Sequence, residues 1–277
     1  MTEPRASCHT PDVPVKPSPA LPAPAATLVL LRNRAEGGVE TLLIQRHHAS
    51  RFAAGDFVFP GGRVEPADVP DDADSWSAGP SPADAARLLG LAADAPGAVG
   101  YWIGAIREAF EEVGILLARD GAGQFPATAD PSFLEHRRTC QQDHRTLWSM
   151  LRAEGLRLAT DRLAYFAHWI TPEENPIRFD TRFFVAEMPP GQDAIADDHE
   201  IIAVRWLSPA AAVAAMRSKE ISLRLPTLTN LRMFDGARSA AEAIARVAGR
   251  GVPTIRPRVI TENGVRRALL PGDPGYY

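Results

Sequence analysis

The chain has 277 residues and a formal net charge of −4, with 45% hydrophobic and 23% charged residues. This is the composition of a globular protein long enough to bury a substantial core. A slightly acidic chain has no overall attraction for nucleic acid or for an anionic membrane, so neither class of partner is expected. The two cysteines, Cys8 and Cys140, cannot form a disulfide framework, and the N-terminal stretch lacks the apolar core of a signal peptide. These features favour a cytoplasmic protein.

The N-terminal third begins with a stretch that is not expected to fold. Residues 1–24 contain seven prolines and few large apolar side chains, which predicts a disordered tail. The next two short apolar runs, Thr27–Leu31 and Glu40–Arg46, flank a glycine pair and predict a β-hairpin. Residues 66–100 are rich in Ala, Asp, Pro and Gly, which indicates an insertion and not a core element, with one short helix over Ala83–Leu89.

Two helices are expected in the middle of the chain. Residues 101–113 place Ile103, Ile106 and Phe110 on one side of a helix. Residues 131–153 read as a second helix, begun by a proline at its first position.

The remaining elements mix strands and helices without strict alternation. This favours the α+β class, as an α/β/α sandwich with a mixed sheet, over a doubly wound sheet. A main domain over residues 25–250 and an extension over 251–277, with a terminal hairpin around Asn263-Gly264, are expected. The β-like runs are Leu163–Ile170, Arg178–Glu187 and Glu200–Leu207, the helical stretches are Pro209–Lys219 and Leu225–Ala248, and the hairpin strands are Pro257–Thr261 and Val265–Leu270.

The segment Arg107–Ile115 contains three carboxylates, Glu108, Glu111 and Glu112, at positions i, i+3 and i+4. On a helix this spacing puts all three on one face, where like charges repel by a few tenths of a kcal/mol per pair. A cation such as Mg²⁺, which takes oxygen ligands, would offset that repulsion. The alternative is a solvated helix face with no ligand.

The segment Phe59-Pro60-Gly61-Gly62 lies upstream of this acidic stretch and is followed by Glu65 and Asp68. Together they resemble the Nudix box, in which a glycine, five residues and a glutamate precede, after seven more residues, Arg-Glu-hydrophobic-x-Glu-Glu-x-Gly-hydrophobic. Three departures stand out. Asp68 replaces the glutamate, Ala109 is small, and 38 residues (69–106) separate Asp68 from Arg107, so an insertion over about 69–100 splits the box.

A second resemblance precedes the box. Leu42-Leu43-Ile44-Gln45-Arg46, Arg51, Gly55 and the Phe-Pro-Gly-Gly segment are similar to the motif of Nudix coenzyme A diphosphatases, apart from His47 at a position that is usually Ser or Ala. The long insertion and the later Trp169–Pro172 and Arg178–Phe184 segments resemble the acyl-CoA diphosphatase branch (nucleoside diphosphate-linked moiety X motif 19-like). The resemblance covers about residues 25–235.

The resemblance implies metal-dependent hydrolysis of the diphosphate of coenzyme A or acyl-CoA, giving 3′,5′-ADP and (acyl-)4′-phosphopantetheine, with Mg²⁺ or Mn²⁺ as cofactor. Arg107 would orient the acids, and Glu111 or the later Glu200 would act as base, although residues 197–200 could equally be a solvated turn. The implied metal ligands are Glu108, Glu111, Glu112, Asp68 and the Gly61 carbonyl, and the implied substrate contacts are Arg46, Arg51 and Gly62.

Several alternatives stay open at this point. Either arginine could instead be a surface residue paired with a nearby acid. The substrate could be another nucleoside diphosphate derivative, such as ADP-ribose or NADH, or the fold could be a binding or regulatory module without catalysis. The insertion is compatible with a lid, an inert excursion or a contact in a homodimer.

Overall fold

The computed structural model describes residues 20–50, 52–92, 95, 97–262 and 264–276. Most of the expected tail therefore lies outside the described residues, and the first strand already begins at Ala23, inside the range that the composition assigned to that tail. No helix in the described ranges is long and apolar enough to cross a membrane.

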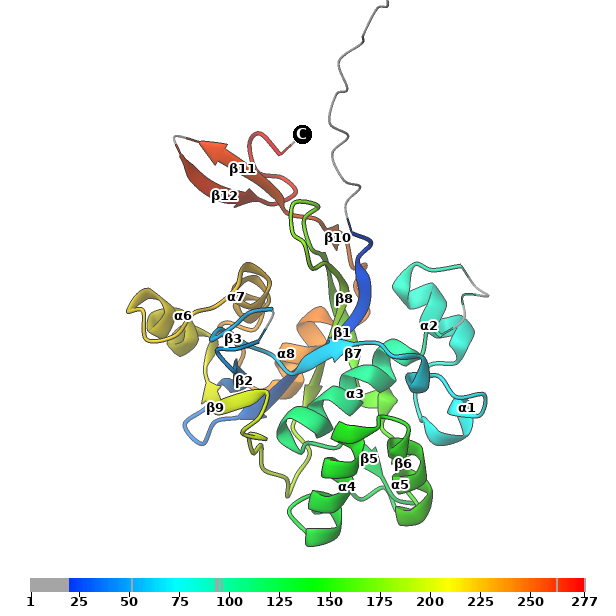
Figure 1. Ribbon diagram of the computed structural model, residues 1–277. Coiled ribbons are helices and arrows are strands. Elements are labelled where there is room, and N and C mark those ends of the chain that lie inside the picture. Colours follow the sequence, from blue (N-terminus) through cyan, green and yellow to red (C-terminus); the bar gives the residue numbers. More distant parts are fainter. Residues whose placement is uncertain (1–19, 51, 93–94, 96, 263, 277) are drawn as a thin grey trace, which may run out of the picture.

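Eight of the described strands form one mixed sheet (Figure 1). Its order is β10-β7-β8-β1-β2-β3, with β4 also pairing with β1 and β9 with β2. The β1–β8 and β10–β7 pairs are parallel and the other pairs are antiparallel. The strands are β1 (Ala23–Asn33), β2 (Val39–Arg46), β3 (Phe57–Val58), β4 (Gly61–Arg63), β7 (Ala164–Ile170), β8 (Phe179–Glu187), β9 (Ile201–Leu207) and β10 (Thr254–Ile255).

Helices cover both faces of this sheet, which confirms the expected α/β/α sandwich. The alternating side chains of β1 show why its sequence is almost wholly apolar: Leu28 and Leu30 pack into one cluster and Val29 and Leu31 into another. Helix α3 (Gly100–Val113) and helices α4 (Pro131–Gln142) and α5 (Thr146–Glu154) contribute to the first cluster. Helices α6 (Pro209–Arg217), α7 (Leu225–Arg232) and α8 (Ala240–Val247) contribute to the second.

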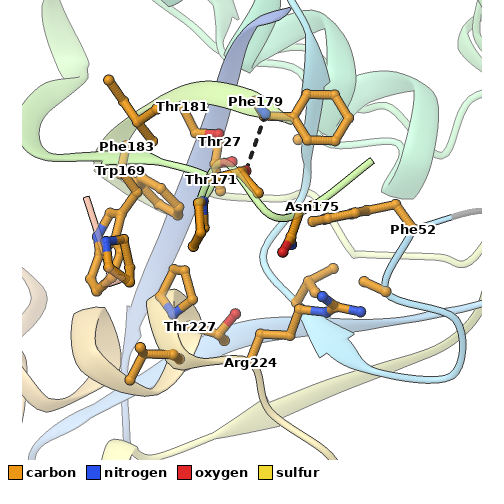
Figure 2. A pocket seen from close by; sticks show the side chains of 18 of the residues that line it. Thr27, Phe52, Trp169, Thr171, Asn175, Phe179, Thr181, Phe183, Arg224 and Thr227 are labelled. Atoms are coloured by element: carbon orange, nitrogen blue, oxygen red, sulfur yellow. Dashed lines mark hydrogen bonds between the residues drawn. The ribbon is translucent and has the colours of Figure 1, made fainter. Parts of the chain in front are cut away.

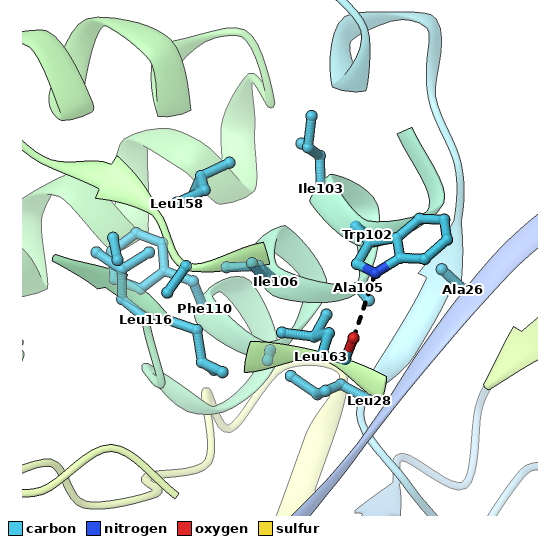
Figure 3. Packing of buried hydrophobic residues seen from close by; sticks show 14 of the residues in the cluster. Ala26, Leu28, Trp102, Ile103, Ala105, Ile106, Phe110, Leu116, Leu158 and Leu163 are labelled. Carbon is cyan, nitrogen blue, oxygen red and sulfur yellow. Dashed lines mark hydrogen bonds between the residues drawn. The ribbon is translucent and has the colours of Figure 1, made fainter. Parts of the chain in front are cut away.

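Helix α3 is the central helix of the first cluster (Figure 3). Its side chains Trp102, Ile103, Ile106 and Phe110 are buried against the sheet, and the Trp102 indole donates a hydrogen bond to a carbonyl oxygen outside the helix. The helix ends at Gly114, whose φ of +73° is left-handed and whose N–H bonds to carbonyls of the last turn. The tight packing gives α3 a fixed position on the sheet.

The insertion is more than an excursion, which corrects the expectation that it adds nothing to the core. It holds a short 3₁₀ helix (Pro66–Asp68), helix α1 (Ala73–Trp76) and helix α2 (Pro82–Leu89). The side chains of Ala85, Ala86 and Leu89 are buried in the same cluster as α3. Small alanines allow this segment to lie close to its neighbours, and their weak hydrophobic signal hid their core role in the sequence.

Two stretches that were expected to be helical throughout are each divided into two helices. The stretch 131–153 is divided into α4 and α5 at Asp143, which has extended backbone geometry. The stretch 225–248 is divided into α7 and α8 by residues 233–239. The other expected helices and strands agree with the observed ones to within a few residues at each end, whereas α1 and the short strands β4, β10, Ala118–Arg119 and Arg157–Leu158 were not expected.

Two small pairs of strands lie outside the main sheet. Strands β5 (Ala118–Arg119) and β6 (Arg157–Leu158) form one. Strands β11 (Arg258–Glu262) and β12 (Val265–Leu269) form the expected C-terminal hairpin and pair antiparallel. Residue 263 of its turn lies outside the described residues. In Figure 1 this hairpin lies beyond β10, beside the loop that joins β7 and β8.

Candidate active site

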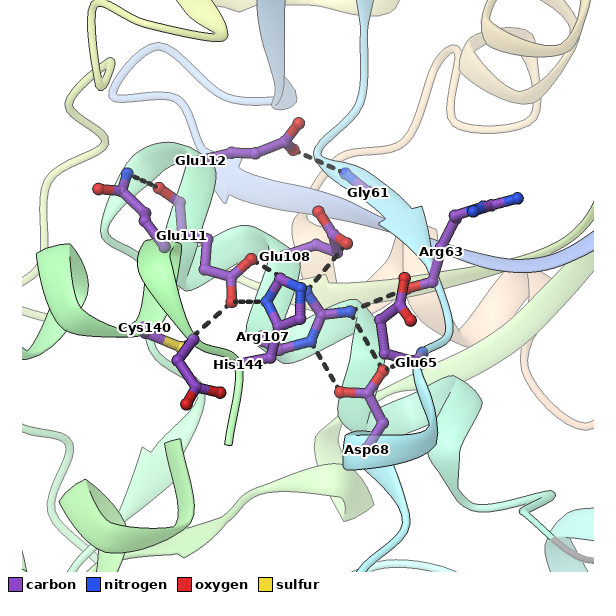
Figure 4. Close-up of polar contacts among 12 residues, drawn as sticks. Gly61, Arg63, Glu65, Asp68, Arg107, Glu108, Glu111, Glu112, Cys140 and His144 are labelled. Carbon is purple, nitrogen blue, oxygen red and sulfur yellow. Dashed lines mark hydrogen bonds and ion pairs between the residues drawn. The ribbon is translucent and has the colours of Figure 1, made fainter. Parts of the chain in front are cut away.

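The acidic face of α3 is turned inward, toward β4, and not toward solvent (Figure 4). Arg107 is completely buried, and Glu111 and Glu112 are buried as well. The solvated-face alternative for this helix is therefore wrong. Burying a charge is costly unless it is paired or binds a cation. The contacts of each charged group therefore show which charges are paired and which could bind a cation.

Arg107 organises the site through all of its N–H groups. Its Nε donates to Asp68 Oδ1 (2.7 Å), and its Nη2 donates to Asp68 Oδ2 (3.1 Å) and to the Arg63 carbonyl (2.8 Å). Its Nη1 donates to Glu108 Oε1 (3.0 Å) and Glu111 Oε2 (2.9 Å). A guanidinium has five N–H donors, so none is left over. Burial opposes its charge, but the bond to Asp68 and the surrounding carboxylates outweigh burial and raise the pKa of Arg107.

Asp68 lies behind Arg107, away from the open part of the site. Its Oδ2 also accepts from the Glu65 N–H (2.8 Å), so both carboxylate oxygens have partners. Asp68 is 1% exposed and is absent from the described lining of the acid-lined cavity. The structure thus places it as an anchor for Arg107, which differs from the expected position beside a metal.

Glu112 connects α3 to the glycine turn. Its Oε2 accepts a hydrogen bond from the Gly61 N–H (2.8 Å), and its Oε1 lies 3.4 Å from Arg46 Nη1. A Cβ on Gly61 would come within 2.5 Å of the Ala26 carbonyl on β1, and one on Gly62 within 2.5 Å of Glu108 Oε1. Because glycine has no Cβ, the pair lets the backbone of β4 lie close to both β1 and the carboxylate of Glu108.

Glu111 has a different set of partners. Its Oε1 lies 3.0 Å from His144 Nδ1 and 3.2 Å from Cys140 Sγ, while its Oε2 accepts from Arg107. Burial, followed by the neighbouring Glu111, raises the pKa of the Cys140 thiol, so it stays a donor. Arg137 donates to the carbonyls of Glu111 and Glu112 at the end of the helix, and Gln141 also donates to the Glu111 carbonyl (2.7 Å).

The site carries more negative charge than its arginines neutralise. Burial is the largest cause that raises the pKa of Glu108 to about 7; the nearby Glu111 adds to it and Arg107 acts against it. Burial, followed by the charge of Glu108, raises the pKa of Glu112 well above its usual range. Both carboxyl groups would ionise more readily beside a bound cation.

The donor chemistry of these residues fits a hard divalent cation, which takes carboxylate and carbonyl oxygens. Within the described ranges, no three acidic, His or Cys side chains are already gathered closely enough to hold a metal ion. Arg107 and His144 contact the carboxylate oxygens of Glu111, and the Gly61 N–H contacts one of Glu112. The assignment of Glu108, Glu111, Glu112 and the Gly61 carbonyl as ligands stays a prediction.

A polar cavity of about 550 Å³ opens over the carboxylates. Arg46 and Glu200 line it, with Arg46 Nη2 3.8 Å from Glu200 Oε2. Arg46 Nε is buried and has no hydrogen-bond partner among the described residues. The expected substrate contact Arg51 lies outside the described residues. The described lining comprises Ala25, Thr27, Arg46, Phe52, Gly61, Gly62, Arg63, Glu65, Glu108, Glu111, Glu112, Gln141, His144, Phe179, Thr181, Asp197, His199 and Glu200.

The run that contains Glu200 is a structured turn before β9. Asp197 Oδ1 accepts from the N–H groups of His199, Glu200 and Ile201, an arrangement typical of an acidic side chain that closes a turn. The turn alternative is thus correct for Asp197, and the same turn presents Glu200, whose side chain is 68% exposed, to the cavity.

A second cavity of about 400 Å³ adjoins the first (Figure 2). The two cavities share Thr27, Arg46, Phe52, Gly61, Phe179 and Thr181 as lining residues. The second cavity is mainly aromatic and aliphatic. Trp169 and Phe183 are buried and also line it.

Sequence reasoning missed the contribution of α4 and the segment after it. Cys140, His144 and Gln141 contact Glu111, and Arg137 caps α3. Their signal was weak, because no motif joins these positions. The four-residue spacing of Cys140 and His144 was the one available hint, and on a continuous helix it would have put both side chains on the same face.

The sequence matches that of a known protein family. A family model described as NUDT19 Nudix domain matches residues 21–234. The chain is 30% identical to the acyl-coenzyme A diphosphatase NUDT19 of Gallus gallus and 27% identical to that of Homo sapiens, in each case over 86% of this chain and 72% of the relative.

A solved structure, the NUDIX hydrolase from Alicyclobacillus acidocaldarius, has a similar fold. It superimposes with a TM-score of 0.69 and 26% identity, over 82% of this chain and 97% of that chain. The family match includes β1, the glycine turn, the insertion and α3. The chain therefore belongs to the Nudix hydrolases, in the family described as the NUDT19 Nudix domain.

Proposed function

We propose that the protein hydrolyses the diphosphate of coenzyme A or acyl-CoA and releases 3′,5′-ADP and (acyl-)4′-phosphopantetheine. One observation carries the proposal: a cavity lined by buried carboxylates adjoins an apolar cavity, and Arg46 lies where the two meet. Acyl-CoA has this same division, with a diphosphate next to a long arm of low charge. The names of the two NUDT19 relatives support the same substrate.

The proposed cofactor is Mg²⁺ or Mn²⁺, held by Glu108, Glu112 and the Gly61 carbonyl, with Glu111 next to them. When bound, such an ion neutralises diphosphate charge and lowers the pKa of a bound water. The raised pKa values of Glu108 and Glu112 support this assignment, because burial and neighbouring carboxylates oppose their ionisation more than Arg107 and Arg46 favour it, and a cation would offset that cost. Asp68 is not retained as a direct ligand, since it is buried behind Arg107 and is absent from the described lining of the acid-lined cavity.

The arginines of the site have separate proposed roles. Arg107 holds the acids in place through its five hydrogen bonds. This role is supported by its complete burial, which keeps the guanidinium away from the open cavity. Arg46 binds a phosphate oxygen, because its Nε has no described partner and a guanidinium forms strong charge-assisted bonds to phosphate. Arg51 is proposed as a second phosphate contact from the motif alone. Gly62 is proposed as a substrate contact because it lines the acid cavity beside Glu108.

Glu200 is the proposed general base. Its side chain lines the acid cavity and, among the described residues, is held by a single 3.8 Å contact to Arg46, so it can move toward a water and accept its proton. Glu111 is the second candidate, but Arg107, His144 and Cys140 already contact its oxygens. These contacts hold its side chain in place and leave it less free to move toward a water.

The proposed location is the cytoplasm. Support comes from the buried free thiol of Cys140, because free thiols persist in a reducing compartment.

A substrate panel tests the proposed function. CoA, acyl-CoAs, ADP-ribose and NADH are incubated with the full chain, with and without Mg²⁺ or Mn²⁺, and products are separated by chromatography. Metal-dependent cleavage of the CoA compounds is expected. Good turnover of ADP-ribose without turnover of CoA compounds would overturn the substrate assignment and leave a Nudix hydrolase of another nucleoside diphosphate derivative.

A further inference from the structure

Part of the wall of the apolar cavity comes from outside the matched family domain. Pro257, Val259 and Ala268 line this cavity, and they follow residue 234, where the family match ends. Val259 and Ala268 are directly opposite one another in the β11–β12 pair. Opposite residues of an antiparallel pair point to the same face. One face of the C-terminal hairpin, defined by Val259 and Ala268, therefore closes part of the cavity.

The position of the hairpin along the joined cavities is also informative. The shared lining includes Arg46 and Gly61, which both contact Glu112. Among the described lining residues, those of the hairpin line the apolar cavity alone. A ligand whose diphosphate lies over the carboxylates would thus meet the shared residues first and the hairpin at the far part of its arm.

The chemistry of the apolar cavity suits such an arm. Its volume of about 400 Å³ lies within the range of small-molecule pockets, which combine apolar walls with a few polar groups. The pantetheine arm of CoA has two amides spaced along an otherwise weakly polar chain, followed by the thioester and its acyl group. The aromatic walls include Phe52, Trp169, Phe179 and Phe183, and the polar side chains include Thr171, Asn175 and Thr227 (Figure 2).

We propose that the C-terminal hairpin is the acyl-binding wall of this enzyme, with Val259 and Ala268 in contact with the acyl chain. This inference rests on the proposed acyl-CoA diphosphatase function and adds a specificity element to it. Each buried methylene changes kcat/KM by about fourfold. The ratio of kcat/KM for an acyl-CoA to that for free CoA should therefore rise with chain length until the cavity is full.

A pair of matched variants tests the role of the hairpin in the full chain. Ala268→Phe adds a ring to the cavity face of β12, and Arg267→Phe adds the same ring next to it on the opposite face. Arg267 is exposed, and its ion pair with Glu262 (3.2 Å) is exposed as well, so its loss costs little stability. The measured quantity is the ratio of kcat/KM for dodecanoyl-CoA to kcat/KM for free CoA, and thermal unfolding midpoints confirm that both variants fold.

Ala268→Phe is expected to lower this ratio at least tenfold, and Arg267→Phe is expected to leave it at the wild-type value. Should Ala268→Phe fail to fold, Val259→Ala gives the second reading, with an expected fall of about fourfold or more from two lost methyl groups. Equal ratios in wild type, Ala268→Phe and Val259→Ala, with CoA still cleaved, would overturn the hairpin inference alone. Cleavage of none of the CoA compounds by the wild type would instead show that the proposed function itself is wrong.

Discussion

Asp68 and Arg107 lie 39 positions apart in the chain and form a buried, two-bonded ion pair with distances of 2.7 and 3.1 Å. This ion pair brings together the two residues that flank the insertion in the sequence. The pair fixes the guanidinium that in turn holds Glu108 and Glu111. The geometry of the acid site thus depends on a residue that does not itself line the cavity.

Asp68→Asn should destabilise the fold by about 2 kcal/mol, because a buried charge-assisted hydrogen bond is lost while Arg107 keeps its other carboxylate partners. The free energy of unfolding in urea measures this loss. Arg138→Ala is the matched control, since it breaks the exposed Arg138–Glu135 pair and should cost less than 1 kcal/mol. Equal effects of the two substitutions would contradict the anchoring role of Asp68.

Stability of the metal-free protein should depend on the protonation of Glu108. Its pKa in the folded protein is raised to about 7 from an ordinary 4.5, so the folded state binds a proton more tightly than the unfolded chain does. The resulting stabilisation is fully present below about pH 4.5 and is lost as the pH rises through about 7. Unfolding in the presence of a chelator should therefore show stability falling from pH 5 to pH 8.

Glu108→Gln should reduce this fall, because the amide does not titrate. Glu135→Gln, on the exposed surface of α4, should leave the slope with pH as in the wild type. An identical slope in wild type and Glu108→Gln would show that Glu108 does not carry the effect.

Arg46→Ala should lower kcat/KM for CoA by about 10- to 100-fold, which corresponds to the loss of one charged hydrogen bond to a phosphate. Arg46→Lys should restore part of this, because a lysine keeps the charge and lacks the fork of donors. Arg32→Ala, which breaks an exposed ion pair with Glu40 on the strand pair β1–β2, serves as the control. If steady-state kinetics give the wild-type kcat/KM for both Arg46→Ala and Arg32→Ala, Arg46 does not bind the substrate.

Glu200→Gln should lower kcat by about 10²- to 10⁴-fold with a smaller change in KM, as expected for the loss of a general base. Asp198→Asn is the control in the same turn, because asparagine tolerates the left-handed backbone at this position (φ +62°). Its kcat should stay at the wild-type value. If Glu200→Gln retains wild-type kcat and Glu111→Gln does not, Glu111 is the base.

Local sequence signals predicted the elements that carry the acids. The apolar period of residues 101–113 and the glycine after them predicted α3 correctly, and the continuous apolar runs predicted the strands whose two faces are both buried. The arginine, three glutamates and glycine turn were also found as a group. Motif spacing and side-chain periodicity are local properties of the sequence. They predict these elements correctly because tertiary packing favours the same local structures.

Contacts between distant segments could not be predicted in the same way. The break between α4 and α5 follows from Asp143, whose side chain accepts a hydrogen bond from the backbone N–H of Arg145 (3.0 Å) in place of continuing the helix. The approach of Cys140 and His144 to Glu111 depends on how α4 packs on α3. The core role of the insertion rests on alanines such as Ala85 and Ala86, whose small side chains give little periodic signal.

Hydrolysis of CoA in ¹⁸O-labelled water, followed by mass spectrometry of the products, tests the proposed reaction. The expected products are 3′,5′-ADP and 4′-phosphopantetheine in equal amounts, with one ¹⁸O atom in one of them, and their formation should require Mg²⁺ or Mn²⁺. Glu112→Gln, which alters the carboxylate bonded to the Gly61 N–H, should reduce product formation at least 100-fold while the protein stays folded. Intact CoA after incubation of the folded wild type with metal, or equal product from Glu112→Gln, would show that the protein is not a CoA diphosphatase that depends on this carboxylate.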